Sequence, residues 1–244
     1  MAVFGRGLVT LALITAAAVG IALGMVFLYA PLDADQGFVQ KIFYLHVPMA
    51  IVALCGFVAG GAMAIMHLRT RDQRWDLRSY VTIHISVILA VGVLVTGSIW
   101  ARASWGHWWV WDEPMLVSFL IVFLLYATYW PLRFSIEDKE RQSRYASVFA
   151  IVAGAFVPLN FAAVRMAEQF THPQTGATVA GGMPPKFALT FAVAFIGMTC
   201  LFVTLCKYEM ASKHATYRLR AIKRKLTGDD DALAVGSRSA APQL

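Results

Sequence analysis

The sequence predicts an all-α integral membrane protein, and three observations lead to this prediction. Hydrophobic residues make up 59% of the 244 residues and charged residues only 14%, which leaves too little polar surface to cover a soluble domain. The apolar residues form six stretches that are each about as long as the roughly 20 residues a helix needs to cross a bilayer. Most Lys and Arg residues fall between these stretches or in the tail. We therefore expect a bundle of six transmembrane helices.

The six stretches are expected to be helical because lipid offers no water to satisfy exposed backbone N–H and C=O groups. The first is too long for the apolar region of a signal peptide and ends before Pro31, so we expect it to stay as a span. Pro48 falls in the first turns of the second, where a missing N–H is tolerated. The spans cover residues 8–30, 43–67, 80–100, 115–132, 146–166 and 187–207.

These spans form a predicted membrane domain over residues 1–210, followed by a tail over residues 211–244. The tail is basic at first, then acidic at Asp229 to Asp231, and then rich in Ser, Ala and Pro. This composition predicts a flexible segment, with disorder after Arg220.

The distribution of basic residues predicts the orientation of the bundle. Of 21 Lys and Arg residues, the six-span arrangement places four on one side, and the rest collect on the other. Because cytoplasmic loops carry the excess of Lys and Arg, we expect both termini in the cytoplasm. The outer loops are then residues 31–42, 101–114 and 167–186, and their basic residues are Lys41, Arg102, Arg165 and Lys186.

Several function classes find no support in the sequence. The net charge of +7 is spread over loops and tail rather than one element, which argues against nucleic-acid binding. Cys55, Cys200 and Cys206 lie within apolar stretches and are interpreted as core residues. No phosphate-binding loop, zinc helix or nucleophile elbow occurs, so we expect no enzyme, and energy from ATP would come from a partner.

The middle outer loop carries the most informative segment of the chain. Residues 105–112 read Trp-Gly-His-Trp-Trp-Val-Trp-Asp and hold four of the seven tryptophans. Tryptophans also anchor membrane proteins at the water boundary, so one interpretation is a structural anchor that recruits a partner. The other is a flat aromatic surface that binds a planar apolar ligand.

Two histidines in the outer regions are candidate axial ligands of a haem iron. His46 lies at the outer end of the second span and His172 in the third outer loop, before Pro173. Two imidazoles on different elements at one membrane depth supply opposite ligands to iron. His107, inside the tryptophan cluster, is an alternative ligand.

The other polar residues have plainer interpretations. Arg102 and Arg165 are candidates to pair with haem propionates, although cations at span ends also extend to the interface without a ligand. Asp112 is expected to fix the loop by accepting N–H bonds. His84 is expected to be hydrogen-bonded within the bundle, and the remaining two histidines, His67 and His214, to be solvated.

Two motifs carry a resemblance to a known family. The segment 105–112, flanked by spans, resembles the tryptophan-rich (WWD-motif) haem-handling proteins of cytochrome c maturation. Residues 41–48, Lys-Ile-Phe-Tyr-Leu-His-Val-Pro, resemble the start of the second span in one branch, haem exporter protein C (CcmC). Six spans in about 240 residues also match that branch, and the resemblance covers roughly residues 8–208.

The resemblance implies a bacterial inner-membrane protein that holds haem b at the periplasmic face and delivers it to the haem chaperone CcmE during c-type cytochrome biogenesis. It also implies an assembly with the ATP-binding-cassette subunits CcmA and CcmB and the small membrane subunit CcmD, in contact with membrane lipid. His46 and His172 match the family's iron ligands. The tryptophan motif matches at Trp105, Gly106, Trp108, Trp109, Trp111 and Asp112.

The chain departs from the family pattern at three places. His107 stands where a small residue is usual, Pro114 where a basic residue is usual, and Ala167 and Glu168 where tryptophans are expected. Two other functions stay open: a membrane redox subunit that keeps b-haem, and haem attachment as in the larger cytochrome c synthases. The scarcity of charges within the spans favours arrival of haem from the lipid rather than through the bundle.

Overall fold

The computed structural model describes residues 6–166 and 182–227, and its regular elements there are all helical. Six helices are long and apolar enough to cross a membrane, which confirms the predicted six-helix membrane bundle. The elements are α1 (Arg6–Gly24), the π-helical η1 (Met25–Tyr29), the 3-10 helix η2 (Phe38–Ile42), α2 (Phe43–Thr70), α3 (Gln73–Trp105), α4 (Pro114–Ala127), α5 (Tyr129–Phe134), α6 (Lys139–Met166) and α8 (Pro185–Thr227).

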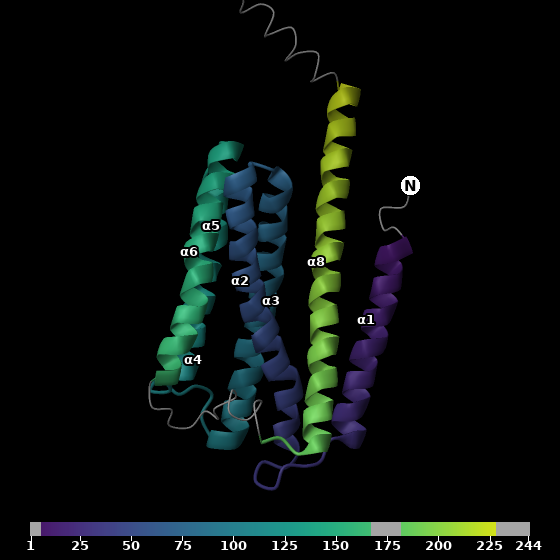
Figure 1. Ribbon diagram of the computed structural model, residues 1–244, viewed down its shortest axis with the longest axis vertical. Helices are drawn as coiled ribbons and strands as arrows, with labels where there is room; N and C mark the ends of the chain where they lie inside the picture. The colour runs from purple at the N-terminus through teal and green to yellow at the C-terminus, as the bar shows by residue number, and fades with distance from the viewer. Residues whose placement is uncertain (1–5, 167–181, 228–244) are drawn as a thin grey trace, which may run out of the picture.

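Helix α2 is the centre of the bundle. It packs against α3, α6 and α8, whereas α1 packs mainly against α8 and η1 (Figure 1). Figure 1 also shows that the described part of the chain starts and finishes at the same end of the bundle. An even number of membrane crossings returns the chain to the side on which it started.

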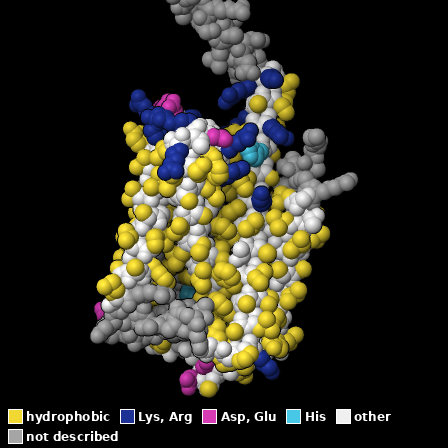
Figure 2. Space-filling model, in the orientation of Figure 1, with side chains coloured by type: hydrophobic (Ala, Val, Ile, Leu, Met, Phe, Trp, Pro, Cys, Tyr) yellow, Lys and Arg dark blue, Asp and Glu magenta, His cyan; other side chains and the backbone are white. Residues whose placement is uncertain are grey.

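The two ends of the bundle differ in charge. Lys and Arg side chains gather at the end that holds the start of α1 and the finish of α8, and apolar side chains cover the middle (Figure 2). We call this the basic end, and the opposite end, where α3 finishes at Trp105, the tryptophan end. That the basic end faces the cytoplasm stays a prediction from the positive-inside rule.

Small residues allow α2 and α3 to approach closely. A Cβ added at Gly60 would lie 2.6 Å from Cγ1 of Ile83, and one added at Gly56 would collide with Oγ of Ser86. The hydroxyl of Ser79 crosses this contact and donates to the carbonyl of Gly60 at 2.8 Å. In lipid, where apolar burial gives helices no reason to associate, such close packing and interhelical hydrogen bonds hold the pair together.

A buried ion pair ties α3 to α5 at the basic end. Arg133 donates to both carboxylate oxygens of Asp76, at 2.8 and 2.5 Å, and also to the Tyr129 hydroxyl at 3.1 Å. Gln142 on α6 donates to the Arg133 carbonyl at 2.7 Å. Although Arg133 directly follows the predicted fourth span, it is 8% exposed and belongs to the core.

Several helices extend beyond the predicted spans, α3 and α6 by seven residues at their N-terminal ends, and two spans differ further. The fourth span consists of α4 and α5, because Pro131 has no N–H to donate to the preceding turn. The sixth helix, α8, continues past the predicted boundary at 207 to Thr227. Residues 211–227 contain no Gly or Pro and several good helix formers, so the helix persists beyond the predicted span through Thr227. The rest of the predicted flexible tail lies outside the described residues.

We expect Arg133→Ala to destabilise the bundle, because Asp76 would be left as a buried carboxylate without its cation. Breaking a buried pair from one side costs about 3–5 kcal/mol. The free energy of unfolding, measured by denaturant titration in mixed micelles, should fall accordingly. Arg144→Ala is the control, because its pair with Glu140 is exposed and should contribute less than about 1 kcal/mol. Equal losses for the two variants would contradict this prediction.

Candidate functional site

The predicted ligand His46 lies in the first turns of α2 and faces α3. Its Nδ1 is 2.9 Å from Oγ1 of Thr96, which lies in the last third of α3. The imidazole is half-buried, so it is neither a core residue nor a solvated surface group. Its position is therefore set by the packing of the two helices.

The hydrogen bonds of Thr96 bear on which nitrogen of His46 carries the proton. The Thr96 hydroxyl donates its one hydrogen to backbone carbonyls of its own helix, at 2.7 Å from Gly92 and 3.2 Å from Val93. With its hydrogen on those carbonyls, the hydroxyl is placed to accept a hydrogen bond from Nδ1–H of His46. The lone pair of the neutral imidazole is then on Nε2, the arrangement in which a second hydrogen bond orients a metal-binding histidine.

Two further residues of α3 shape the surroundings of the imidazole. A Cβ added at Gly97 would lie 2.9 Å from Cε1 of His46, so the ring occupies space that only glycine leaves open. The Trp100 ring meets the His46 ring edge to face, with centroids 5.8 Å apart. Trp100 also makes an edge contact with Phe43. Within about one and a half turns, α3 thus places three groups beside the His46 ring: the Thr96 hydroxyl, the space left by Gly97 and the Trp100 ring.

The loop before α2 is fixed to the same region. Gln36 accepts a hydrogen bond from the Trp100 indole at 2.8 Å, and Asp33 holds the turn by accepting from the backbone N–H of Gln36 at 2.8 Å. Lys41 is buried and donates to the Val26 carbonyl at 2.6 Å. The Lys41 ammonium lies at the C-terminal end of η1. A helix leaves carbonyls unpaired at that end, and these carbonyls attract a cation.

The tryptophan cluster follows the end of α3. Gly106 adopts a left-handed conformation, φ 78°, that closes the helix, and the Arg102 guanidinium donates to its carbonyl. Beyond it, Trp108 and Trp111 are 60% and 70% exposed, too much for core residues. They present indole surface at the tryptophan end, which agrees both with an interfacial anchor and with a ligand-binding surface.

Trp109 differs from its neighbours because its indole N–H is buried. Its ring lies edge to face with Trp111, with centroids 6.0 Å apart. Within the described residues, Nε1 of Trp109 has no hydrogen-bond partner. Glu113, which begins α4 as its N-cap residue, is fully buried close to it in sequence, and a carboxylate is favoured at a helix N-terminus.

The structure does not bring all the predicted site residues together. At about 1.5 Å of rise per residue, Trp105 lies roughly 13 Å further along the α3 axis than Thr96, so His46 is deeper than the tryptophan cluster. His107 and Asp112 are exposed in the loop. The expected N–H bonds to the Asp112 carboxylate are not found within the described ranges. His172 and the side chain of Arg165 lie outside what the structure describes.

The other histidines lie at or near the basic end. His67, expected to be solvated, is instead 3% exposed, with Nδ1 3.2 Å from the Asp72 carbonyl, because the turn between α2 and α3 folds over it. His84 lies within the bundle as expected, but the predicted hydrogen bond is not formed by its Nδ1 in the described ranges: the nearest carboxylate oxygen, of Glu209 on α8, is 3.7 Å away. His214 is exposed, as predicted.

Thr96, Gly97 and Trp100 were not predicted from the sequence as site residues. One signal was available: a Thr-Gly pair interrupts an apolar span, and intramembrane polar groups usually have a partner on a neighbouring helix. The partner of Thr96 depends on how α2 and α3 pack against each other, and this packing cannot be predicted from hydropathy or motifs. Chemically, the arrangement offers an imidazole held at Nδ1, aromatic walls and one buried donor. These groups suit a planar, largely apolar ligand that carries a metal.

Comparison with known proteins supports this interpretation. A sequence model of the family described as Heme exporter protein C matches residues 1–225. The chain is 29% identical to Heme exporter protein C of Paracoccus denitrificans, over 79% of this chain and 80% of the relative. Identity to the protein of that name is 29% in Rhodobacter capsulatus, over 82% and 83% of the two chains, and 32% in Bradyrhizobium diazoefficiens, over 80% and 74%.

We expect Thr96→Val to remove the preference for the Nδ1-protonated form of His46, because valine keeps the shape but accepts no hydrogen bond. The ¹⁵N chemical shifts of the imidazole in histidine-labelled protein report which nitrogen is protonated. Thr199→Val is the matched control, since its hydroxyl also bonds to the carbonyl four residues earlier, at 2.8 Å, but not to His46. Unchanged shifts in Thr96→Val would contradict the assignment.

Proposed function

The chain belongs to the haem exporter protein C family, and from that premise we propose that it presents haem at the tryptophan end and delivers it to a haem chaperone. Membership implies haem handling in cytochrome c biogenesis by a multi-pass membrane protein. Beyond this, we propose the inner membrane as its location and the periplasmic face as the side of the tryptophan end.

The single observation that carries the proposal is the 2.9 Å contact between Nδ1 of His46 and Oγ1 of Thr96. An iron ligand must offer an unprotonated nitrogen, and the Thr96 hydroxyl leaves the proton on Nδ1 and the lone pair on Nε2. Gly97 provides room for the ring and Trp100 limits its rotation. Histidines that bind metals are held in just this way by a second hydrogen bond.

The tryptophan cluster supplies the rest of the proposed site. The exposed indoles of Trp108 and Trp111 would contact the apolar face of a haem, with Trp105 and Gly106 at the end of α3 beside them. Trp109 keeps a buried N–H that has no acceptor in the described part of the chain. A donor buried in that way is costly, and a ligand that brings an acceptor would remove the cost.

His172 is proposed as the second axial ligand, with His107 as the alternative. Arg102 donates to Gly106 with one of the five N–H groups of its guanidinium and keeps others for a propionate. Arg165, in the last turn of α6, is the second proposed propionate contact. Asp112 stays a candidate member of the site through the motif alone.

We propose that the cargo is haem b and that the acceptor is the chaperone CcmE. The sequence contains no ATP-binding loop, so we also propose the ATP-binding-cassette subunits CcmA and CcmB and the small subunit CcmD as partners. A transfer role fits better than catalysis, because the described site pairs no general acid with a general base. Assistance with haem attachment to the chaperone stays an open alternative.

The alternative of a b-haem redox subunit has less support. It calls for two histidine pairs at different depths within the helices. Among the described residues, His84 is the histidine well inside a span away from the tryptophan end, and the carboxylate of Glu209 faces it. A carboxylate in that position supplies no second imidazole.

We expect His46→Ala to lower the haem content of the purified protein most strongly. Haem-to-protein stoichiometry and the absorption spectrum, compared for wild type and for the single variants His46→Ala, His107→Ala and His172→Ala, identify the ligands. His84→Ala is the control and should keep the wild-type haem content, because it lies toward the opposite end. Full haem retention in the double variant His46→Ala and His172→Ala would overturn the ligand assignment.

Gly97→Val should weaken haem binding without unfolding the protein. The new side chain would occupy the space of Cε1 of His46 and move the imidazole away from its ligand position. Disturbing the groups that orient a metal ligand typically costs about 10–100-fold in affinity. Haem titration in detergent measures the effect. Gly20→Val, where an added Cβ meets nothing within 4 Å, should bind haem as wild type does.

A further inference from the structure

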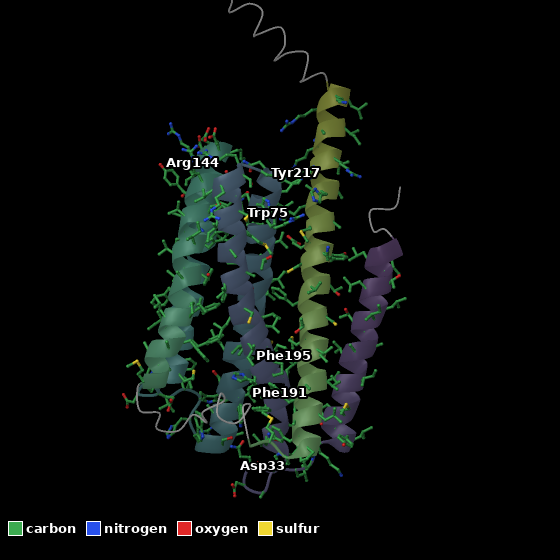
Figure 3. All side chains as sticks on the ribbon, viewed as in Figure 1. Asp33, Trp75, Arg144, Phe191, Phe195 and Tyr217 are labelled. Carbon is green, nitrogen blue, oxygen red and sulfur yellow. The ribbon has the colours of Figure 1, made fainter. Side chains whose placement is uncertain are left out.

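A basic cleft opens at the end of the bundle opposite the tryptophan cluster. It lies where α8 stands apart from α3 (Figure 1) and has a volume of about 1180 Å³. Figure 3 shows Trp75 on α3 and Tyr217 on α8 at this end, on the two sides of the space between the helices. The cationic residues that line the cleft are Arg71, Arg74, Arg133, Lys139, Arg144, Lys213, Arg220 and Arg224, against the acids Asp76 and Glu140.

The ion pairs at this end leave part of the positive charge uncompensated. Asp76 is bound by Arg133, and Glu140 pairs with Arg144 at 2.8 Å. Lys213 pairs with Glu209 at 3.3 Å.

Arg74 on α3, Lys139 on α6 and Arg220 on α8 have no carboxylate within 4.0 Å in the described ranges. In that part of the chain, three helices therefore each contribute a cation without an acidic partner to one cleft. An anion whose negative charge is confined to a small group, such as a phosphate, is the ligand that this arrangement favours.

The inner wall of the cleft is apolar and aromatic. Leu77, Tyr80 and Phe134 line it, and Tyr80 is flanked by two cations, with Arg133 5.0 Å and Lys213 5.4 Å from its ring centroid. Polar groups on α8, among them Ser212 and Thr216, line the opposite wall. The Thr216 hydroxyl donates to the Ser212 carbonyl at 3.0 Å, so the lining offers the Ser212 hydroxyl as a donor near an anion and an apolar surface below it.

An exposed apolar stripe on α3 continues from the cleft toward the middle of the bundle. Ile88, Val91 and Val95 follow His84 at helical spacings that place them on the same face, and they are 49%, 45% and 54% exposed. His84 itself faces Glu209 of α8, so the stripe lies on the side where α8 diverges. In a bilayer, apolar side chains at that depth would contact hydrocarbon.

We propose that the basic cleft binds the headgroup of an anionic phospholipid, with the acyl chains lying along the stripe of Ile88, Val91 and Val95. Cations at the mouth neutralise the phosphate, and the apolar surface below receives the chains. A nucleotide or an acidic peptide satisfies the cations but leaves the stripe unused. Basic recesses between transmembrane helices on the cytoplasmic side are suited to anionic headgroups.

The test uses the full chain in neutral detergent and native mass spectrometry. The protein is titrated with phosphatidylglycerol and with phosphatidylcholine that carries the same acyl chains. We expect one phosphatidylglycerol to bind much more tightly than phosphatidylcholine. Equal binding of the two lipids would overturn the proposal.

A charge-matched pair of variants locates the site. The cleft variant replaces Arg74, Lys139 and Arg220 with Gln, and the control replaces Arg69, Arg141 and Arg218, which lie on α2, α6 and α8 at the same end but outside the cleft. Since each cation near an anionic surface contributes about a fivefold factor, the cleft variant should lose on the order of 100-fold in affinity and the control little. Equal loss in both variants would indicate general attraction and overturn the proposal.

Two further measurements separate lipid binding in the cleft from misfolding and from peptide binding. Arg220→Glu changes one exposed residue near the end of α8, where the helix extends beyond the bundle, and should weaken lipid binding at least tenfold without affecting the fold. Displacement of the lipid by a glutamate-rich peptide at low concentration would instead indicate a protein-binding groove and overturn the proposal. Haem content should stay unchanged in all these variants, because His46 lies at the other end, so the two proposals fail separately.

Discussion

The close contact between α2 and α3 is the interaction on which the rest of the structure depends. Gly56 and Gly60 remove the side chains that would hold the helices apart, and the Ser79 hydroxyl donates across the contact. In lipid, the helices gain nothing by hiding apolar surface from water, so packing at short range must supply the attraction. The same approach brings His46 against Thr96 near the other end of the pair. Stability and the candidate haem site thus rest on one helix contact.

The buried ion pair and the cationic cleft lie at one end of the bundle, and the proposed haem site lies toward the other. At the basic end, Asp76 and Arg133 form a buried pair that orders α5, and further cations surround the cleft. At the tryptophan end, the buried cation Lys41 is satisfied by backbone carbonyls of η1 rather than by an acid. The proposed haem site is therefore built mainly from an imidazole, aromatic rings and hydrogen bonds, which suits a ligand with a large apolar face.

The sequence predicted the class of fold and the position of the spans because both follow from local properties. Twenty apolar residues in lipid have no stable alternative to a helix, whatever their neighbours are. The ends of the helices were predicted less accurately than the positions of the spans. α8 extends to Thr227 because nothing in residues 211–227 stops a helix, and hydropathy reports only where the lipid ends, not where the helix ends. His46 and the tryptophan segment were found because their residue types are rare at a membrane boundary.

The sequence by itself determined that this is a six-span membrane protein with a tryptophan-rich loop and a candidate ligand, His46, toward one end. Only the tertiary structure decided that Thr96, Gly97 and Trp100 surround that ligand, that His67 is buried, and that the tryptophan cluster begins further along α3 than the imidazole. The physical reason is the same in each case. Hydropathy and motifs depend on neighbours in the chain, whereas a tautomer, a gap for a ring or a buried ion pair depends on which faces of two helices meet.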